Sequence, residues 1–165
     1  MVNFNPFTYP IRRATVDDLP AIRELFVSVV RNIGEKYYNQ KQLTAWASRA
    51  GDDTRWTNAI HEQYFIVIKN KGRLVGFGSL KEKNYIDFLF VDNDFQNRGI
   101  ASCLYQTLEQ KARNADVSIL RADVSKSAKP FFIKQGFVTK KENRILINGT
   151  VLINYCMEKR LQEDT

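Results

Sequence analysis

Apolar residues in the first third of the chain recur with the spacing of amphipathic helices. Thr15 is a suitable N-cap for a helix whose apolar positions recur every three or four residues until Gly34. Further helical patterns cover residues 40–50 and 52–62, and a short apolar strand over 11–14 precedes all three. This region is therefore predicted to form one strand followed by three helices.

The rest of the chain is dominated by β-branched and aromatic runs separated by turn residues. Asn148-Gly149, between two such runs, predicts a hairpin. One helical pattern begins near Arg98, and a second, shorter one covers residues 125–135. The pattern predicts an α/β fold with a mixed, largely antiparallel central sheet flanked by helices. The predicted strands cover residues 64–68, 74–80, 84–91, 119–124, 144–147 and 151–157.

The composition fits one globular domain spanning residues 1–165. Hydrophobic residues make up 44% of the chain, enough for a real core. No apolar run approaches the ~20 residues of a membrane span, and the first ten residues lack the pattern of a signal peptide. Cys103 and Cys156 lack metal-ligand spacing, so we expect free thiols, no metal and a cytoplasmic protein.

The net charge of +7 raises the question of nucleic-acid binding. The basic residues are dispersed, and no dense basic run or aromatic RNA-binding signature occurs. A basic nucleic-acid-binding protein is therefore the less favoured alternative. A polyanionic ligand would also account for a positive field around its site.

The most informative segment follows the apolar run 86–91. A polar turn leads to Gln96-Asn97-Arg98-Gly99-Ile100-Ala101, where a helical pattern begins. Free N–H groups and the positive end of the helix dipole at such a junction suit a phosphate, and glycine permits close approach to the backbone. The segment has neither the Lys-Ser/Thr of a Walker loop nor the three glycines of a Rossmann fingerprint.

Two motifs in this chain resemble those of the GNAT superfamily of N-acetyltransferases. The first is Gln/Arg-x-x-Gly-x-Gly/Ala, matched by Gln96, Gly99 and Ala101. The second is Ala-x-x-aromatic-aromatic-x-x-x-Gly-Phe, matched over residues 128–137. Scattered residues elsewhere resemble one bacterial subgroup of poorly defined substrate. The resemblance implies transfer of an acetyl group from acetyl-CoA to a primary amine of a small molecule or a protein.

The resemblance also implies how the co-substrate binds. The exposed strand edge Leu89-Phe90-Val91 would pair with the pantetheine arm, and the Val91 N–H would stabilise the oxyanion, a role worth ~3 kcal/mol in comparable sites. The aromatic helix with Phe131 and Phe132 would lie beside that arm. The residues expected around the pyrophosphate are Gln96, Asn97, Arg98, Gly99, Ile100, Ala101 and Ser102.

The chain departs from the family pattern at the general acid. Many members have tyrosine at the second aromatic position, which is Phe132 here and has no proton to give. Tyr155, in the last predicted strand, is the leading substitute, and a packed tyrosine with a bonded hydroxyl is the competing interpretation. Loss of catalysis altogether would instead leave an acetyl-CoA-binding sensor or regulatory module.

For the base, side-chain alternation places Tyr85 and Asp87 on the same strand face as Leu89 and Val91. Either could reach the amine through a water, and Asp87 has an alternative role as a hydrogen-bonded carboxylate that orients a loop.

The acceptor pocket is expected beside the first helices, with Tyr37, Trp46 and Trp56 as candidate contacts. Core packing is the competing role for these aromatic residues. The chain is expected to work as a monomer or homodimer, away from membranes.

Overall fold

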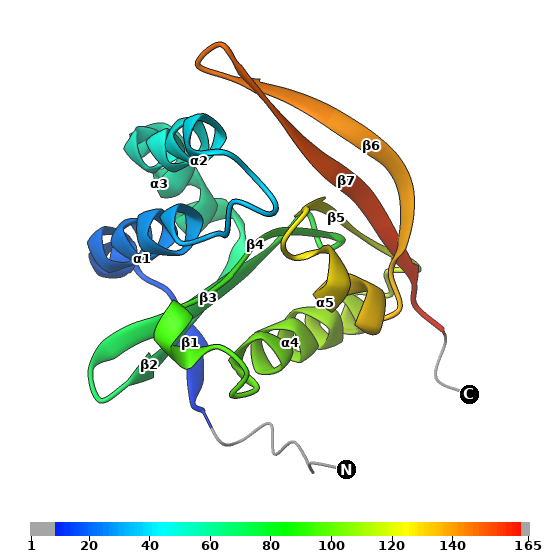
Figure 1. Ribbon diagram of the computed structural model, residues 1–165. Helices are drawn as coiled ribbons and strands as arrows, with labels where there is room; N and C mark the ends of the chain where they lie inside the picture. Colours follow the sequence, from blue (N-terminus) through cyan, green and yellow to red (C-terminus); the bar gives the residue numbers. More distant parts are fainter. Residues whose placement is uncertain (1–8, 163–165) are drawn as a thin grey trace.

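The computed structural model describes residues 9–162, which form a seven-stranded sheet covered by helices on both faces (Figure 1). The strand order is β1-β2-β3-β4-β5-β7-β6, and every neighbouring pair is antiparallel except β4–β5. The predicted mixed, largely antiparallel α/β fold is thereby confirmed. The strands are β1 (Ile11–Arg13), β2 (Tyr64–Asn70), β3 (Arg73–Lys81), β4 (Tyr85–Val91), β5 (Ile119–Ser125), β6 (Val138–Ile147) and β7 (Thr150–Arg160).

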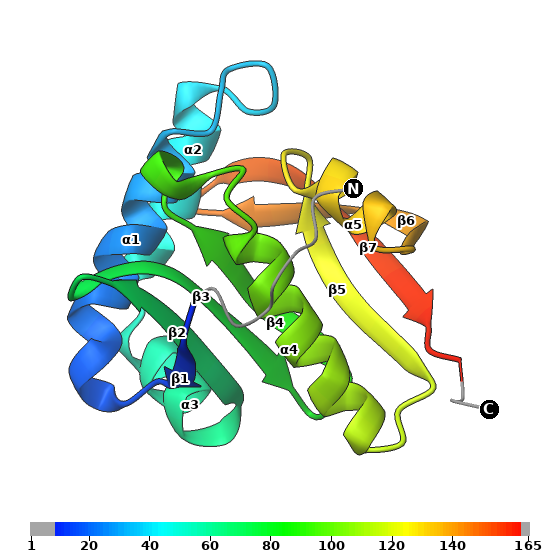
Figure 2. The same cartoon turned by 90° about the horizontal axis from the view of Figure 1, so that it is seen from below.

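The helices divide the core into two clusters, one on each face of the sheet. On one face lie α1 (Leu19–Arg31), α2 (Gln40–Ala47) and α3 (Asp53–Glu62). On the other lie α4 (Ile100–Asn114) and α5 (Lys129–Lys134); seen from below, α4 runs along the sheet between β4 and β5 (Figure 2). Among residues 9–162, no helix has the length and apolar character needed to cross a membrane.

Several predicted elements have different bounds in the structure, among them two helices and one strand. The helix expected over 40–50 ends at Ala47 and continues as a 3-10 turn, Ser48–Gly51. The helix expected over 125–135 is shorter, because residues 125–128 form a turn in which the Ser125 carbonyl accepts from the Ala128 N–H. Strand β6 starts six residues earlier than predicted. Its first half pairs with β7 at the edge of the sheet and is polar, so no alternation of apolar residues marks it in the sequence.

Strand β4 contains a β-bulge at Asp87. On β3, Ser79 pairs with Phe88 and Leu80 with Ile86, so Asp87 is an extra residue without a partner. The parallel pairing of β4 with β5 covers only two positions, ending at Ile86 with Ala122. Beyond the bulge the two strands separate, which leaves the β5-facing edge of Leu89-Phe90-Val91 without a strand partner in the described sheet.

Two glycines on β3 let α4 lie directly on the sheet. A Cβ built on Gly76 would lie 3.0 Å from Ile100 Cγ2 and 3.1 Å from Leu104 Cδ1, and one on Gly78 would lie 3.2 Å from Leu108 Cδ1. Any larger residue would push the helix outward. The glycines thus fix the height of α4, and with it the position of the α4 N-terminus beside the end of β4.

Candidate active site

The turn before α4 has the geometry of an anion site. Gly99 is the N-cap, with a φ of 80° that glycine adopts readily. The Cys103 N–H makes a hydrogen bond of 3.0 Å to the Gly99 carbonyl, the first one inside the helix. The N–H groups of Ile100, Ala101 and Ser102 precede that bond, so they have no helical carbonyl to donate to and are available to a ligand.

The three side chains before Gly99 are exposed, and one of them also donates a hydrogen bond to β4. Arg98 is exposed and its guanidinium lies 4.9 Å from the centre of the Phe95 ring. Asn97 is exposed with a φ of 60°. The Gln96 side chain instead donates a hydrogen bond of 2.8 Å to the carbonyl of Val91. Gln96 therefore connects the turn to the end of β4.

The amide of Val91 points into the gap between β4 and β5. The next residue, Asp92, donates its N–H to the Val75 carbonyl on β3 at 2.8 Å. Because successive residues of a strand direct their amide groups to alternate sides, the Val91 and Leu89 N–H groups face away from β3. They lie where a ligand backbone could pair with β4 as a further strand.

A cavity of about 260 Å³ lies at this gap, and residues from both faces of the sheet line it. From the face of α4 and α5 come Ala128 and Phe132, and from the other face come the aromatic residues of α1–α3. The gap thus connects the two faces at the point where β4 and β5 separate. The polar and charged lining residues are Tyr38, Arg49, Arg55, Tyr85, Asp87, Asp123, Ser125 and Asn154.

The bulge reverses the expected side-chain alternation of β4. Leu89 and Val91 pack on the α4 face, whereas Asp87 contacts residues of the α3 region and Phe88 packs in the core under α1–α3. Tyr85, next to Ile86 of the α4 face, lies on the α1–α3 side as well. The prediction that Tyr85 and Asp87 share a face with Leu89 and Val91 is wrong, because the extra residue shifts the period by one.

Asp87 has both carboxylate oxygens occupied. Arg55 donates to Oδ1 at 3.1 Å and Gln63 donates to Oδ2 at 2.7 Å. The Asp87 side chain is only 7% exposed, and Arg55 also lies 4.9 Å from the centre of the Phe88 ring. These contacts attach the bulge to α3 and to Gln63, the residue that follows α3.

Tyr85 contacts a carboxylate that sequence reasoning missed. Its hydroxyl donates to Asp123 Oδ2 at 2.8 Å, and the amide of Asn143 donates to Asp123 Oδ1 at 2.9 Å. Burial, and then the hydrogen bond to Asp123, raise the pKa of Tyr85, so this phenol remains a donor. Asp123 is an exposed position between buried Ala122 and Val124, and this alternation in β5 was the only sequence signal for it.

Tyr155 does not line the cavity. It pairs with Val124 across β5 and β7, and it packs against the core on the α4 and α5 face. The Lys129 ammonium lies 4.0 Å from the centre of its ring. Phe132, the position of the usual acid, is 4% exposed and lines the cavity, with the Phe137 ring 5.0 Å away. Phe131 packs against Tyr105.

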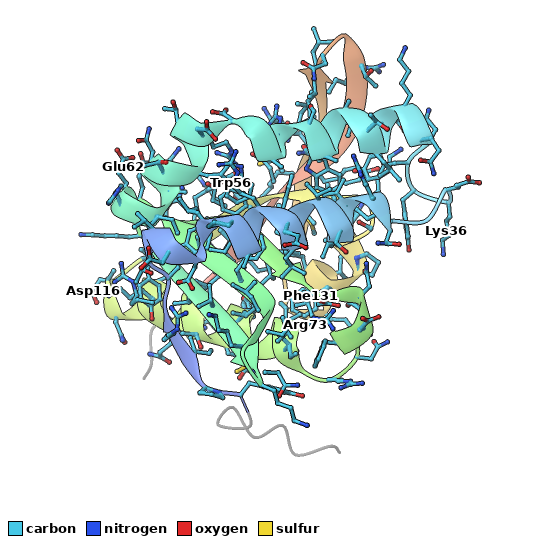
Figure 3. All side chains as sticks on the ribbon, turned by 90° about the vertical axis from the view of Figure 1, so that its left-hand side faces the viewer. Lys36, Trp56, Glu62, Arg73, Asp116 and Phe131 are labelled. Atoms are coloured by element: carbon cyan, nitrogen blue, oxygen red, sulfur yellow. The ribbon has the colours of Figure 1, made fainter. Side chains whose placement is uncertain are left out.

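The predicted acceptor contacts have separate positions. Trp46 lines the cavity and contacts Phe90 edge-on at 6.4 Å. Trp56 also borders the cavity but is 1% exposed; it lies between the helices and stacks on Phe88 (Figure 3). Tyr37 is not among the lining residues, and the Lys36 ammonium lies 5.2 Å from the centre of its ring.

Tyr38, the neighbour of Tyr37, joins three segments at the cavity wall. Its hydroxyl donates to the Ile153 carbonyl at 2.6 Å and accepts from the Lys126 N–H at 3.0 Å. Burial raises the pKa of Tyr38, which keeps the hydroxyl protonated. The residue thereby holds the α1–α2 loop against β7 and the β5–α5 turn.

The two cysteines lie on different elements, Cys103 on α4 and Cys156 on β7. Cys103 is buried and Cys156 partly buried, and neither forms a disulfide. In residues 9–162, no group of three or more His, Cys, Asp or Glu side chains is placed to hold a metal ion.

Comparisons with known proteins agree with this geometry. The family model described as an acetyltransferase (GNAT) domain matches residues 35–159. YafP of Escherichia coli strain K12, an uncharacterized N-acetyltransferase, is 33% identical over 152 residues, which cover 92% of this chain and 96% of YafP.

Solved structures give the same result. A GCN5-related N-acetyltransferase (aminotransferase, class II) from Rhodopseudomonas palustris has a TM-score of 0.90 at 32% identity, covering 96% of this chain and 99% of that one. PaiA N-acetyltransferase from Thermoplasma acidophilum, in complex with coenzyme A, has a TM-score of 0.74 at 16% identity, covering 94% and 100%. At that identity the second likeness concerns the fold alone.

Proposed function

We propose a reaction for this chain, which belongs to the GNAT family of acetyltransferases and uses acetyl-CoA: the acetyl group passes directly to a primary amine bound on the α1–α3 side of the sheet. The observation that carries the proposal is the cavity at the gap between β4 and β5. It gives a thioester on one face a direct path to an amine on the other.

The coenzyme side of the proposal rests on backbone donors. The N–H groups of Ile100, Ala101 and Ser102 would bind the pyrophosphate at the start of α4. The free edge of β4 would pair with the pantetheine arm, and the Val91 N–H would donate to the thioester carbonyl. As that oxygen gains negative charge, this hydrogen bond strengthens, which lowers the barrier by ~3 kcal/mol in comparable sites.

On the acceptor side, the amine must lose a proton before it attacks. Asp123 has a carboxylate at the cavity, held by Tyr85 and Asn143, and we assign it the general-base role, directly or through a water. The amine nitrogen bonds to the acetyl carbon, the carbon–sulfur bond breaks, and the sulfur leaves as a thiolate. Tyr155, on the coenzyme side of the sheet, is the proposed source of the proton for that sulfur.

The test is release of free thiol from acetyl-CoA across a panel of primary amines. Gly99→Glu places a carboxylate where the pyrophosphate binds, whereas Gly99→Asn keeps a residue that tolerates positive φ. We expect Gly99→Glu to abolish acetyl-CoA binding in calorimetry and Gly99→Asn to retain it. Unchanged affinity in a folded Gly99→Glu variant, or acetyl-CoA binding without thiol release for any amine, would contradict the proposed reaction.

A further inference from the structure

Arg49, an exposed residue of the turn Ser48–Gly51, is among the lining residues of the cavity. Arg49 and Arg55 are the cations among the lining residues, and Arg55 is paired with Asp87 at 3.1 Å. Within residues 9–162, the Arg49 side chain makes neither an ion pair nor a hydrogen bond. The guanidinium is therefore free to donate to a ligand that binds in the cavity.

The turn that carries Arg49 is held by hydrogen bonds from three other segments. Trp56 donates its indole N–H to the Arg49 carbonyl at 3.0 Å, and Arg23 of α1 donates to the Ala50 carbonyl at 2.6 Å. At the tip of the β6–β7 hairpin, the Asn148 amide donates to Ser48 Oγ at 2.9 Å. A guanidinium on such a fixed turn loses less conformational freedom when it binds an anion than one on a loose segment.

Charge is arranged across the cavity in a way that suits a zwitterion. Both Asp123 of β5 and Arg49 of the turn between α2 and α3 line the cavity, so it is bordered by a carboxylate and by a guanidinium that come from different elements. The opposite charge of Arg55 already neutralises Asp87. The aromatic ring of Trp46 forms part of the wall, which suits an apolar stem.

We propose that the acceptor is a small primary amine that carries a carboxylate, an amino-acid-type molecule whose carboxylate binds Arg49 and whose amine lies at Asp123. This inference rests on the proposed acetyl transfer and names its substrate class. A single carboxylate matches a single unpaired guanidinium, which can bind both oxygens of a carboxylate at once. The carboxylate takes no part in bond making; it orients the amine toward the acetyl carbon.

The experiment compares amino acids with their amides, which keep the amine but lose the negative charge. Wild-type protein should acetylate the acids with kcat/KM higher by about 10- to 100-fold, the range for a hydrogen-bonded charged partner. Arg49→Gln should remove this preference by raising KM for the acids far more than KM for the amides. Arg49→Lys should restore part of it, and Arg31→Gln, an exposed arginine of α1, should change nothing.

The outcomes separate the two proposals. Equal activity of wild-type protein on acids and amides, or a preference for acids that persists in folded Arg49→Gln, would overturn the carboxylate assignment while acetyl transfer stands. Absence of thiol release with every amine, in protein that binds acetyl-CoA, would instead overturn the transfer reaction itself.

Discussion

The side-chain amide of Gln96 donates a hydrogen bond of 2.8 Å to the carbonyl oxygen of Val91. That bond joins the two proposed coenzyme contacts, since the N–H groups of the turn lie on one side of it and the Val91 N–H on the other. Gln96 therefore positions the backbone on which both contacts depend.

Replacing the Gln96 donor with an isosteric acceptor should loosen this connection. Gln96→Glu directs a carboxylate at the Val91 carbonyl, and we expect acetyl-CoA affinity to fall about tenfold, the loss of ~1–2 kcal/mol typical of a hydrogen bond. Calorimetry measures this. Gln106→Glu, an exposed glutamine of α4, is the control for the added charge. Equal affinity in Gln96→Glu and wild-type protein would show that the bond does not order the site.

Gly76 sets the distance between α4 and β3, so adding a methyl group there should disturb both stability and binding. A Cβ at Gly76 would lie 3.0 Å from Ile100 Cγ2 and 3.3 Å from the Phe90 carbonyl oxygen. We expect Gly76→Ala to lower the free energy of unfolding by ~1–3 kcal/mol and to weaken acetyl-CoA binding. Gly51→Ala, with nothing within 4 Å, should do neither; urea unfolding and calorimetry decide.

The two cavity carboxylates should respond differently to the same change. Asp123→Asn removes the proposed base, and kcat should fall by roughly 10²- to 10⁴-fold with little change in thermal midpoint. Asp87→Asn disturbs the buried pair with Arg55, so its main effect should be a lower midpoint. The reverse pattern, with activity lost mainly in Asp87→Asn, would transfer the role of base to Asp87.

The source of the proton for the departing sulfur is tested by two aromatic positions. Tyr155→Phe should lower kcat more than it weakens acetyl-CoA binding. Phe132→Tyr, which adds a hydroxyl at the cavity, should partly rescue that loss in the double variant. Full activity in Tyr155→Phe, with no response to Phe132→Tyr, would show that neither residue donates the proton. Solvent or backbone groups would then stabilise the departing thiolate.

Stability in acid should depend on Asp18. Its carboxylate is 5% exposed and accepts two hydrogen bonds from Arg12 at 2.7 and 2.8 Å and one from the Thr15 N–H. The hydrogen bonds from Arg12 are the main cause that lowers the pKa of Asp18 to about 2. Because the pKa is lower in the folded protein than the ~3.9 of an unfolded chain, the stabilisation is complete above that value and is lost as the pH falls toward 2.

We therefore expect Asp18 to contribute on the order of 2 kcal/mol at neutral pH. Denaturant unfolding at pH 3 and pH 6 measures the contribution. Asp18→Asn should be less stable than wild type at pH 6, and the difference should narrow at pH 3. An Asp18→Asn penalty that is the same at both pH values would contradict this origin.

The glycine and the small residues of the phosphate turn could be identified from the sequence because helix starts have local rules, and Gly99 does cap α4. The bulge at Asp87 could not, since nothing in an apolar run marks an extra residue, and the alternation drawn through it was therefore wrong. Asp123 was missed because its role depends on Tyr85 and Asn143, which only the tertiary structure brings to it. Likewise, Tyr38 and Tyr37 are adjacent aromatics whose different roles follow from packing.

The bulge in β4 makes the cavity depend on how many residues the strand contains. Asp87 is the one extra residue between the pairs that β4 forms with β3, and the pairing of β4 with β5 ends at Ile86, the residue before it. Substitutions along β4 change its side chains but keep the number of residues in the strand. We expect that deletion of one residue here would restore regular pairing with β3 and extend the parallel pairing with β5, which would close the gap in the sheet. Redesign of this scaffold is therefore freer to change side chains in β4 than to change its length.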